Sequence, residues 1–269
     1  ESGTTDTFGV QLAAQPNTNV VLTVASGDNG EVTVGPTSLT FTPGNWSANQ
    51  TVTITGVDDP LIDGNQVTQV TVSVDAANSD DNFDAVPDQT VTVTTADNDA
   101  AGFLLSKSTA AVSESGTTDT FTVRLSAQPD SNVVLAVSSA DPGEVAASPL
   151  QLTFAPANWN VPQTVTVAGV QDDRIDGSQQ TAVTVSVVDV LSDNRFDALP
   201  DQSVTVTTTD DDVAGFTLSK SAANVSESGS QDTFTVVLAA QPDTNVVLAI
   251  VSGDVIEATV VPATVTFVI

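Results

Sequence analysis

The most constraining feature of this sequence is an internal repeat. The segment ESGTTDTF at residues 1–8 returns unchanged at 114–121 and as ESGSQDTF at 227–234, a spacing of 113 residues without insertion or deletion. Solenoid repeats are about 20 to 50 residues long, whereas an independent β-sandwich has about 100. The repeat therefore predicts separately folded domains, which we place at 1–99, 100–212 and 213–269.

Alternation of apolar and polar residues indicates the fold of each repeat. Thr, Ser or Gln occupies most outward positions, and no helical periodicity persists, which favours strands. The chain is therefore predicted to be all-β, in tandem immunoglobulin-like antiparallel sandwiches of seven strands. The first repeat lacks its first strand, and the third contains only the first four. The strand segments of the complete repeat are GFLLS, TFTVRL, NVVLAV, LQLTF, QTVTVAGV, TAVTVSVV and SVTVTT.

Charge and composition exclude several classes of function. Lys and Arg number 5 against 34 acidic residues, a net charge of -29, so a nucleic-acid or anionic-membrane partner is disfavoured. The chain has no Cys and no His, which removes thiolate sites and the commonest general base. No apolar run is long enough to insert into a membrane. We expect no enzyme, because a carboxylate pair duplicated in every tandem repeat would be unusual.

The acidic residues fall in loops that should meet at one end of each sandwich. Successive strands cross between the two poles, so the first, third and fifth connections share a pole with the segment that leaves the last strand. The complete repeat and the first repeat both place acids in all four of these stretches. In the complete repeat they are Glu114, Asp141, Glu144, Asp172, Asp173, Asp176, Asp210, Asp211 and Asp212. In the first repeat the set is Glu1, Asp28, Glu31, Asp58, Asp59, Asp63, Asp97, Asn98 and Asp99.

So many carboxylates need a counter-charge. Two carboxylates about 5 Å apart repel by about 3 kcal/mol at an effective dielectric of about 20. Arg174 is the one basic residue in these loops. An all-oxygen, highly negative and loop-borne ligand set is typical of Ca²⁺, whereas Mg²⁺ prefers fewer carboxylates and more water. The alternative interpretation is a solvated acidic pole that maintains solubility.

Several motifs of the complete repeat resemble those of the Calx-β family of immunoglobulin-like calcium-binding sandwiches. They are Gly102-Phe103, VSESG at 112–116, Asp141, QDDRIDG at 171–177 and the triplet 210–212. The resemblance implies Ca²⁺-ligand roles for the eight residues Glu114, Asp141, Asp172, Asp173, Asp176, Asp210, Asp211 and Asp212. The repeat implies the same for Glu1, Asp28, Asp58, Asp59, Asp63, Asp97, Asn98 and Asp99. The style of NWNVPQTVTV is similar to repeats of very large bacterial surface proteins.

These observations predict a structural segment of a long extracellular or cell-surface protein, an adhesin or matrix fibre. Its sandwiches would be stacked end to end and made rigid by Ca²⁺ at each junction. The expected partners are calcium, neighbouring repeats and other copies of the chain. Two other functions remain open: a regulatory calcium sensor, and a carbohydrate- or ligand-binding module that uses Trp46 and Trp159. We expect both Trp residues to close the end of the sandwich.

Overall fold

The computed structural model describes all residues from 1 to 269 and contains strands and two three-residue 3₁₀ turns, η1 (Ala76–Asn78) and η2 (Asp189–Leu191). The chain divides into two compact units. Unit 1 comprises Glu1–Gly102, Leu125–Asp130 and Pro156–Asn160, and unit 2 comprises the remainder. No helix of the structure has the length and apolar character needed to cross a membrane. The predicted boundaries of the three repeats stay predictions, and we use the repeats below only as sequence segments.

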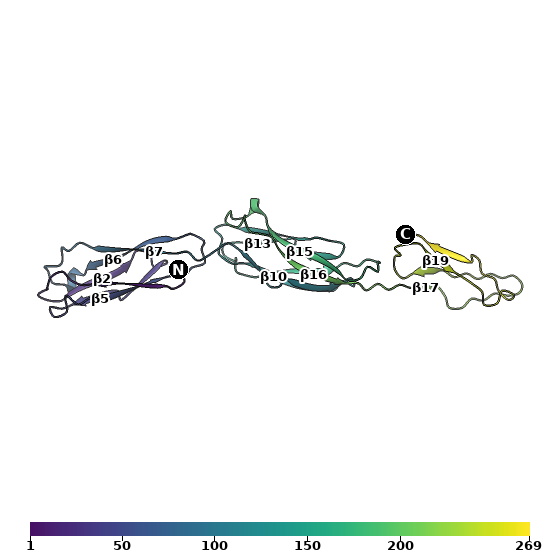
Figure 1. Ribbon diagram of the computed structural model, residues 1–269, viewed down its shortest axis with the longest axis horizontal. Helices are drawn as coiled ribbons and strands as arrows, with labels where there is room; N and C mark the ends of the chain where they lie inside the picture. The colour runs from purple at the N-terminus through teal and green to yellow at the C-terminus, as the bar shows by residue number, and fades with distance from the viewer. The chain divides into compact units, whose positions relative to one another are not determined.

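The first repeat folds into two facing sheets, seen as the purple-to-blue ribbons of Figure 1. One sheet has the order β1-β5-β3 and the other β4-β2-β6-β7, with antiparallel pairing throughout. One buried apolar cluster joins residues of both sheets, which makes the pair a sandwich. The strands are β1 (Thr5–Val10), β2 (Val20–Ser26), β3 (Val32–Gly35), β4 (Ser38–Phe41), β5 (Gln50–Gly56), β6 (Gln66–Val74) and β7 (Gln89–Thr95).

Alternation along each strand explains this packing. In β5, Val52 and Ile54 point into the core, whereas Thr51 and Thr53 lie on the outer face. Successive side chains of a strand point to opposite faces, so one face can be apolar while the other meets water. The sequence pattern therefore determines which face of each strand is buried.

The second repeat has two sheets with one more strand in each than the first repeat. Their orders are β12-β14-β10-β8 and β13-β11-β15-β16-β9, and the β16–β9 pair is parallel. Their apolar faces supply most of the remaining buried residues of the chain. The strands are β8 (Phe103–Leu105), β9 (Thr109–Ser113), β10 (Thr118–Leu125), β11 (Val133–Ser139), β12 (Val145–Ser148), β13 (Gln151–Phe154), β14 (Gln163–Gly169), β15 (Gln179–Val187) and β16 (Gln202–Thr209).

The structure has nine strands in this repeat where the sequence analysis predicted seven. The predicted first strand is two strands, β8 and β9, which lie in opposite sheets. The additional strand β12 pairs with β14, and Pro149 separates it from β13 in the other sheet. Proline has no N–H for a sheet ladder, so the chain leaves one sheet there and enters the other.

The third repeat contains two separate strand pairs. β17 (Phe216–Leu218) pairs with β18 (Val236–Leu238), and β19 (Val246–Ala249) pairs with β20 (Thr264–Phe267). Many of its apolar side chains are exposed, whereas their counterparts in the second repeat are buried. The four strands that were predicted for this repeat are therefore present, and each pairs with only one other strand.

Candidate metal centre

Acids from four distant stretches of the second repeat meet at one end of its sandwich. Glu114 follows β9, Glu144 precedes β12, Asp176 lies between β14 and β15, and Asp210 and Asp212 follow β16. Carboxylate oxygens of Glu114, Asp210 and Asp212 all lie within 4.8 Å of one another, and so do those of Glu114, Glu144 and Asp176. We call this set, with Asp172, the acidic pole of the second repeat. Glu114 belongs to both groups.

Strand pairing places the side chains of Glu114 and Asp210 together. The parallel pairing of β9 with β16 ends at Ser113 opposite Thr209, so Glu114 and Asp210 are the next residues on adjacent strands. The backbone N–H of Glu114 donates to the carbonyl of Thr209 at 3.1 Å, which continues the ladder by one bond. Both carboxylates therefore lie at the same end of the sheet.

Asp210 connects the segment after β16 to the loop between β14 and β15. Its Oδ2 accepts a hydrogen bond from the N–H of Gly177 at 2.8 Å, and its Oδ1 accepts one from the N–H of Asp212 at 2.8 Å. Gly177 has φ of +75°, a conformation that side chains rarely adopt. The turn at Gly177 thus brings the 171–177 loop to the acidic pole.

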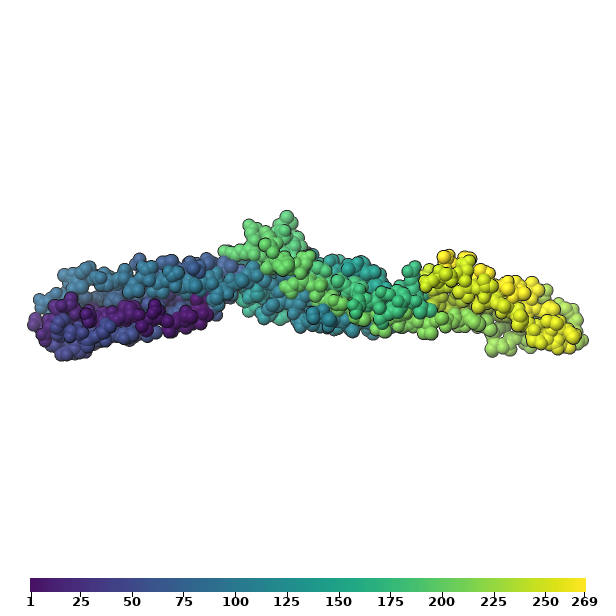
Figure 2. Space-filling model, in the orientation of Figure 1, coloured from purple at the N-terminus to yellow at the C-terminus, as the bar shows by residue number.

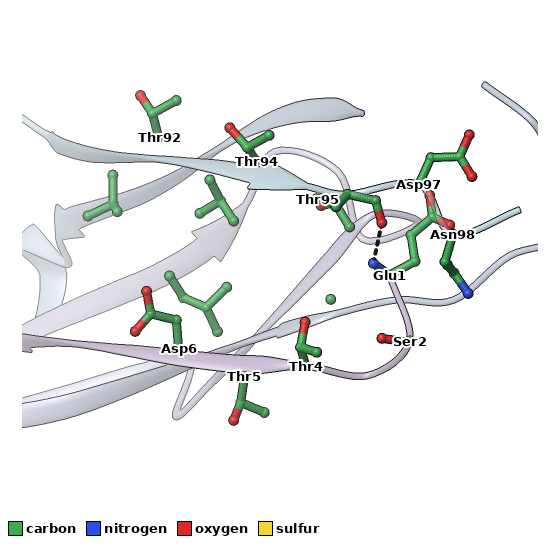
Figure 3. A pocket seen from close by; sticks show the side chains of 15 residues that line it. Glu1, Ser2, Thr4, Thr5, Asp6, Thr92, Thr94, Thr95, Asp97 and Asn98 are labelled. Atoms are coloured by element: carbon green, nitrogen blue, oxygen red, sulfur yellow. Dashed lines mark hydrogen bonds between the residues drawn. The ribbon is translucent and has the colours of Figure 1, made fainter. Parts of the chain in front are cut away.

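The first repeat builds the same arrangement from the equivalent residues. The amine of Glu1 donates to the carbonyl of Ala96 at 2.7 Å, and the N–H of Gly64 donates to Asp97 Oδ2 at 2.8 Å. Carboxylate oxygens of Glu1, Asp97 and Asp99 lie within 4.8 Å of one another. Figure 3 shows Glu1, Asp97 and Asn98 at one end of a cavity that all three residues line. These three residues with Asp99 form the acidic pole of the first repeat.

Burial at the acidic pole of the second repeat changes how its carboxyls titrate. Glu114 is 1% exposed, and its Oε2 has no hydrogen-bond partner. Burial, reinforced by the negative charges of Asp210 and Asp172, raises the pKa of Glu114 to about 7. Burial is also the first cause of the raised pKa of Glu144 and of Asp212, with nearby acids adding to it. One oxygen of each of these two side chains is also buried without a partner.

The first repeat shows the same electrostatic pattern. Burial raises the pKa of Glu1, Glu31 and Asp99. Asp97 is the exception, because backbone N–H groups of Asp99 and Gly64 hold the pKa of its carboxyl below the usual value. Unpaired buried carboxylate oxygens are costly, so both acidic poles have the donor set and the electrostatic demand of a cation site.

Other predicted ligand residues have local hydrogen-bonding roles. Oδ1 of Asp28 accepts from the N–H of Gly30, and Oδ1 of Asp141 accepts from the N–H of Gly143, so both side chains order their own turns. Asp59 and Asp172 likewise accept from the N–H two residues on. Asp58 accepts from Asn98 Nδ2 at 3.1 Å. The remaining predicted ligands, which are exposed, are Asp63, Asp173 and Asp211.

Glu144 and its equivalent Glu31 are the residues that sequence reasoning undervalued. It placed both among the acids of this pole, but the ligand set implied by the family resemblance did not include them. In the structure the carboxylate of Glu144 lies with those of Glu114 and Asp176, and Glu31 is buried. The signal that could have identified them is position: each directly precedes a buried Val at the start of a strand.

The two Trp residues are half-buried, and the backbone carbonyl of each accepts a hydrogen bond from a residue just after β1 or at the end of β10. The carbonyl of Trp46 accepts from the N–H of Leu12, and that of Trp159 accepts from the N–H of Leu125, each at 3.0 Å. The ring of Trp46 packs against the buried cluster of the first repeat. The structural role that we expected and the alternative ligand-binding role both stay predictions.

At the opposite pole of the first repeat, Asp80 already has hydrogen-bond partners. Asp80 accepts hydrogen bonds from the backbone N–H groups of Asn17, Thr18 and Asn82, which lowers its pKa. In the second repeat, Phe196 is fully buried in the corresponding loop. Figure 2 shows the green residues around η2 standing out from the surface there, and Val190 is among the most exposed side chains. Asp80 therefore serves to hold the loop of the first repeat at this pole.

Comparisons with known proteins give weak similarities only. No family model and no curated protein matches the chain. It is similar to the E. coli chaperone DraB at 9% identity, over 44% of this chain and 59% of that one, with a TM-score of 0.32. The similarity to domains 4 and 5 of the S-layer protein SbsC has 17% identity, 70% coverage of each chain and a TM-score of 0.34. For calcium binding domain CBD12 of CALX1.1, the values are 17%, 67% of this chain, 73% of that chain and 0.33. At these TM-scores, no property of those proteins is transferred to this chain.

Proposed function

We propose that this chain is a calcium-stabilised structural segment of an extracellular surface protein, an adhesin or matrix fibre. The observation that carries the proposal is Glu114. Its carboxylate is buried, has an oxygen without a hydrogen-bond donor, and faces the like charges of Asp210 and Asp172. A bound cation would satisfy that oxygen and cancel the repulsion.

Calcium fits the acidic poles better than other common metals. The chain has neither His nor Cys, so carboxylates and carbonyls are the available ligands, and Ca²⁺ accepts six to eight oxygens. In the second repeat, Glu114, Asp210 and Asp212 could hold one ion, and Glu114, Glu144 and Asp176 a second. The ion would supply the positive charge that these side chains lack and would hold their loops together.

Backbone hydrogen bonds to residues of the following repeat support a mechanical role. They start from the acid-bearing loop, which is 58–64 in the first repeat and 171–177 in the second. They end at the turn that follows the strand TFTVRL, or its equivalent TFTVVL, of the next repeat. In unit 1, the N–H of Gln128 donates to the carbonyl of Pro60 at 2.8 Å, beside a parallel bridge from Leu61 to Gln128. In unit 2, the N–H of Gln241 donates to the carbonyl of Asp173 at 2.6 Å, with the bridge from Arg174 to Gln241. Calcium that orders the acid-bearing loop would therefore also order its contact with residues of the following repeat.

An extracellular location is consistent with this mechanism. Extracellular calcium modules bind with Kd of about 10⁻⁴ to 10⁻³ M, which suits millimolar calcium outside cells. An ion that binds only the folded state stabilises it by RT ln(1 + [L]/Kd), about 1.4 kcal/mol at a tenfold excess over Kd. No catalysis is part of this proposal, and adhesion to a target would belong to other segments of such a protein.

The test is a thermal melt of the full chain with calcium or with chelator, comparing the native sequence with Glu114→Gln. We expect calcium to raise the Tm of the native chain. Glu114→Gln should raise the Tm in chelator, because it removes a buried like charge, and should reduce the increase that calcium causes. Asp201→Asn, an exposed acid remote from the acidic pole, is the matched control.

Three outcomes would overturn the proposal. Equal melting of the native chain with calcium and with chelator would exclude calcium stabilisation. An unchanged calcium response in Glu114→Gln would show that calcium binds elsewhere. A Kd below micromolar, measured by calorimetry, would replace the structural role by that of a regulatory sensor. X-ray scattering in the same two conditions would test whether calcium stiffens the chain.

A further inference from the structure

The chain contains one Asn-Gly pair, Asn29-Gly30, in the loop between β2 and β3. In such a pair the backbone nitrogen of glycine can attack the side-chain carbonyl carbon of asparagine, because glycine has no Cβ to obstruct the approach. The attack forms a cyclic imide and releases ammonia, and water then opens the ring to aspartate or isoaspartate. Asparagine is for this reason a chemically labile residue. The loop therefore carries a residue pair that can modify itself.

The pair is open to solvent in the structure. Asn29 and Gly30 are both exposed, whereas Glu31 and Val32, the next two residues, are buried. Water and hydroxide, which the reaction needs, therefore reach the pair directly. The reactive residues form the exposed part of a turn whose far end is fixed at the start of β3.

Hydrogen bonds hold the attacking nitrogen within this turn. The N–H of Gly30 donates to Asp28 Oδ1 at 2.8 Å, and the N–H of Val32 donates to the carbonyl of Asp28 at 2.9 Å. The hydroxyl of Ser26 donates to the same carbonyl at 2.8 Å. For the reaction, the Gly30 nitrogen must lose its proton and approach Asn29 Cγ, so its bond to Asp28 must break first. The Asp28 side chain therefore restrains the reaction.

The same bond closes the equivalent turn in the other two repeats. The N–H of Gly143 donates to Asp141 Oδ1, and the N–H of Ile256 donates to Asp254 Oδ1, each at 2.9 Å. Such bonds from an aspartate side chain to the backbone two residues on are a local property of the turn. The arrangement therefore recurs in three repeats that differ in the strands around them.

The first repeat alone has an asparagine in this turn. The equivalents of Asn29 are Pro142 in the second repeat and Val255 in the third, and neither has a side-chain amide. The three turns therefore share their hydrogen bonding and differ in chemistry. Only the turn of the first repeat has both the amide that is attacked and the glycine that attacks it.

Conversion of Asn29 would change the charge beside the acids of the first repeat. Glu31 is buried, and this burial, followed by the charges of Asp63 and Asp59, raises the pKa of its carboxyl. A carboxylate at position 29 would add to this repulsion, because it stands next to Asp28 and two residues from Glu31. Isoaspartate would also lengthen the backbone of the turn by one methylene group, which would disturb its hydrogen bonds.

We propose that Asn29 is a site of spontaneous deamidation whose rate is set by the hydrogen bond from Gly30 to Asp28. The Gly30 nitrogen gives its proton to solvent base and bonds to Asn29 Cγ, and the side-chain nitrogen takes up a proton and leaves as ammonia. Water adds to either imide carbonyl, which gives aspartate or isoaspartate. An amide and water thus become a carboxylate and ammonium, with no redox change. The first repeat gains one negative charge as the chain ages.

Peptide mapping by mass spectrometry tests this proposal on the full chain, kept in chelator at neutral pH for increasing times. We expect conversion at Asn29 to exceed that at other asparagines, such as Asn65 and Asn78, and to yield isoaspartate together with aspartate. Asp28→Ala should accelerate the conversion about three- to tenfold, because Gly30 loses its hydrogen-bond acceptor. Asp28→Asn should keep the native rate, because its amide oxygen accepts the same bond without the charge.

Four results would overturn the proposal. Conversion at Asn29 no faster than at Asn78 would show that the pair is not reactive in the folded chain. Aspartate without isoaspartate would exclude attack by Gly30, because direct hydrolysis leaves the backbone unchanged. Equal rates in the native chain and Asp28→Ala would show that the hydrogen bond does not set the rate. Acceleration in Asp28→Asn equal to that in Asp28→Ala would indicate an effect of charge. Because chelator is present throughout, none of these outcomes depends on calcium binding.

Discussion

The first and second repeats form their acidic poles with equivalent hydrogen bonds. The bonds from Glu1 to Ala96 and from Gly64 to Asp97 reproduce those from Glu114 to Thr209 and from Gly177 to Asp210. The acidic pole therefore depends on the segment after the last strand and on the acid-bearing loop. The apolar cores differ, because Phe8 is half-buried whereas its equivalent Phe121 is fully buried.

The two acidic poles also differ in their acids. Asn98 is equivalent to Asp211 of the second repeat. Its side-chain amide donates a hydrogen bond to Asp58, whose equivalent in the second repeat is Gln171. Two groups of three carboxylates meet in the second repeat, and one such group meets in the first. The two repeats therefore share a scaffold for a cation but differ in the negative charge that they offer it.

Truncating one aromatic side chain in each repeat would test the difference between the cores, and we expect this effect to be the largest. Phe121→Ala should reduce the free energy of unfolding of the second repeat by about 3–5 kcal/mol, since the residue is fully buried. Phe8→Ala should cost the first repeat about 1–2 kcal/mol, because part of the ring is already exposed. Guanidinium unfolding followed by fluorescence, with either Trp46 or Trp159 as the sole tryptophan, measures each repeat separately.

The exposed Val190, changed to Ala, is the control for that experiment and should have no measurable effect. Equal losses for Phe121→Ala and Phe8→Ala would contradict the comparison, because they would mean that the first repeat is as fully packed as the second.

The pH dependence of calcium binding should follow Glu114. Its pKa in the ion-free protein is about 7, above the ordinary 4.5, so the folded state holds a proton that the unfolded state has released. The associated stability is fully present below pH 4.5 and is lost as pH rises through 7. Calcium competes with this proton, so its affinity should be roughly tenfold lower at pH 6 than at pH 8. Calorimetry at both pH values tests this, and Glu114→Gln should flatten the dependence.

A charge added to the first repeat should give the smallest effect. Asn98→Asp replaces the donor to Asp58 by a like charge, so it should lower the Tm in chelator. The same change should tighten calcium binding at the first repeat by up to about fivefold, because the side chain is exposed and its charge is partly screened. Calcium titrations of a variant whose second acidic pole is disabled by Glu114→Gln isolate this site. A weaker calcium affinity in Asn98→Asp would mean that the amide oxygen is itself a preferred ligand.

Much of this architecture could be predicted from the sequence. The alternation in β5 and β14 indicated which residues face the core, and counting connections gathered Glu114, Asp176 and Asp210 at one end. The division of the first strand into β8 and β9 could not be predicted, because GFLLS and AAVS alternate equally well in one sheet or in two. The short strand β12 was missed because VAAS has little apolar pattern of its own and depends on β14 for pairing.

The sequence by itself determined that the chain consists of β-strand repeats spaced 113 residues apart and that the acids of a repeat share a pole. Strand periodicity and connection order are properties of the linear chain. Only the tertiary structure decided that Glu114, Glu144 and Asp212 are among the acids with a buried oxygen that lacks a partner. Burial and hydrogen bonding depend on which residues approach from elsewhere in the fold, so identical segments such as 1–8 and 114–121 can differ in exposure and charge.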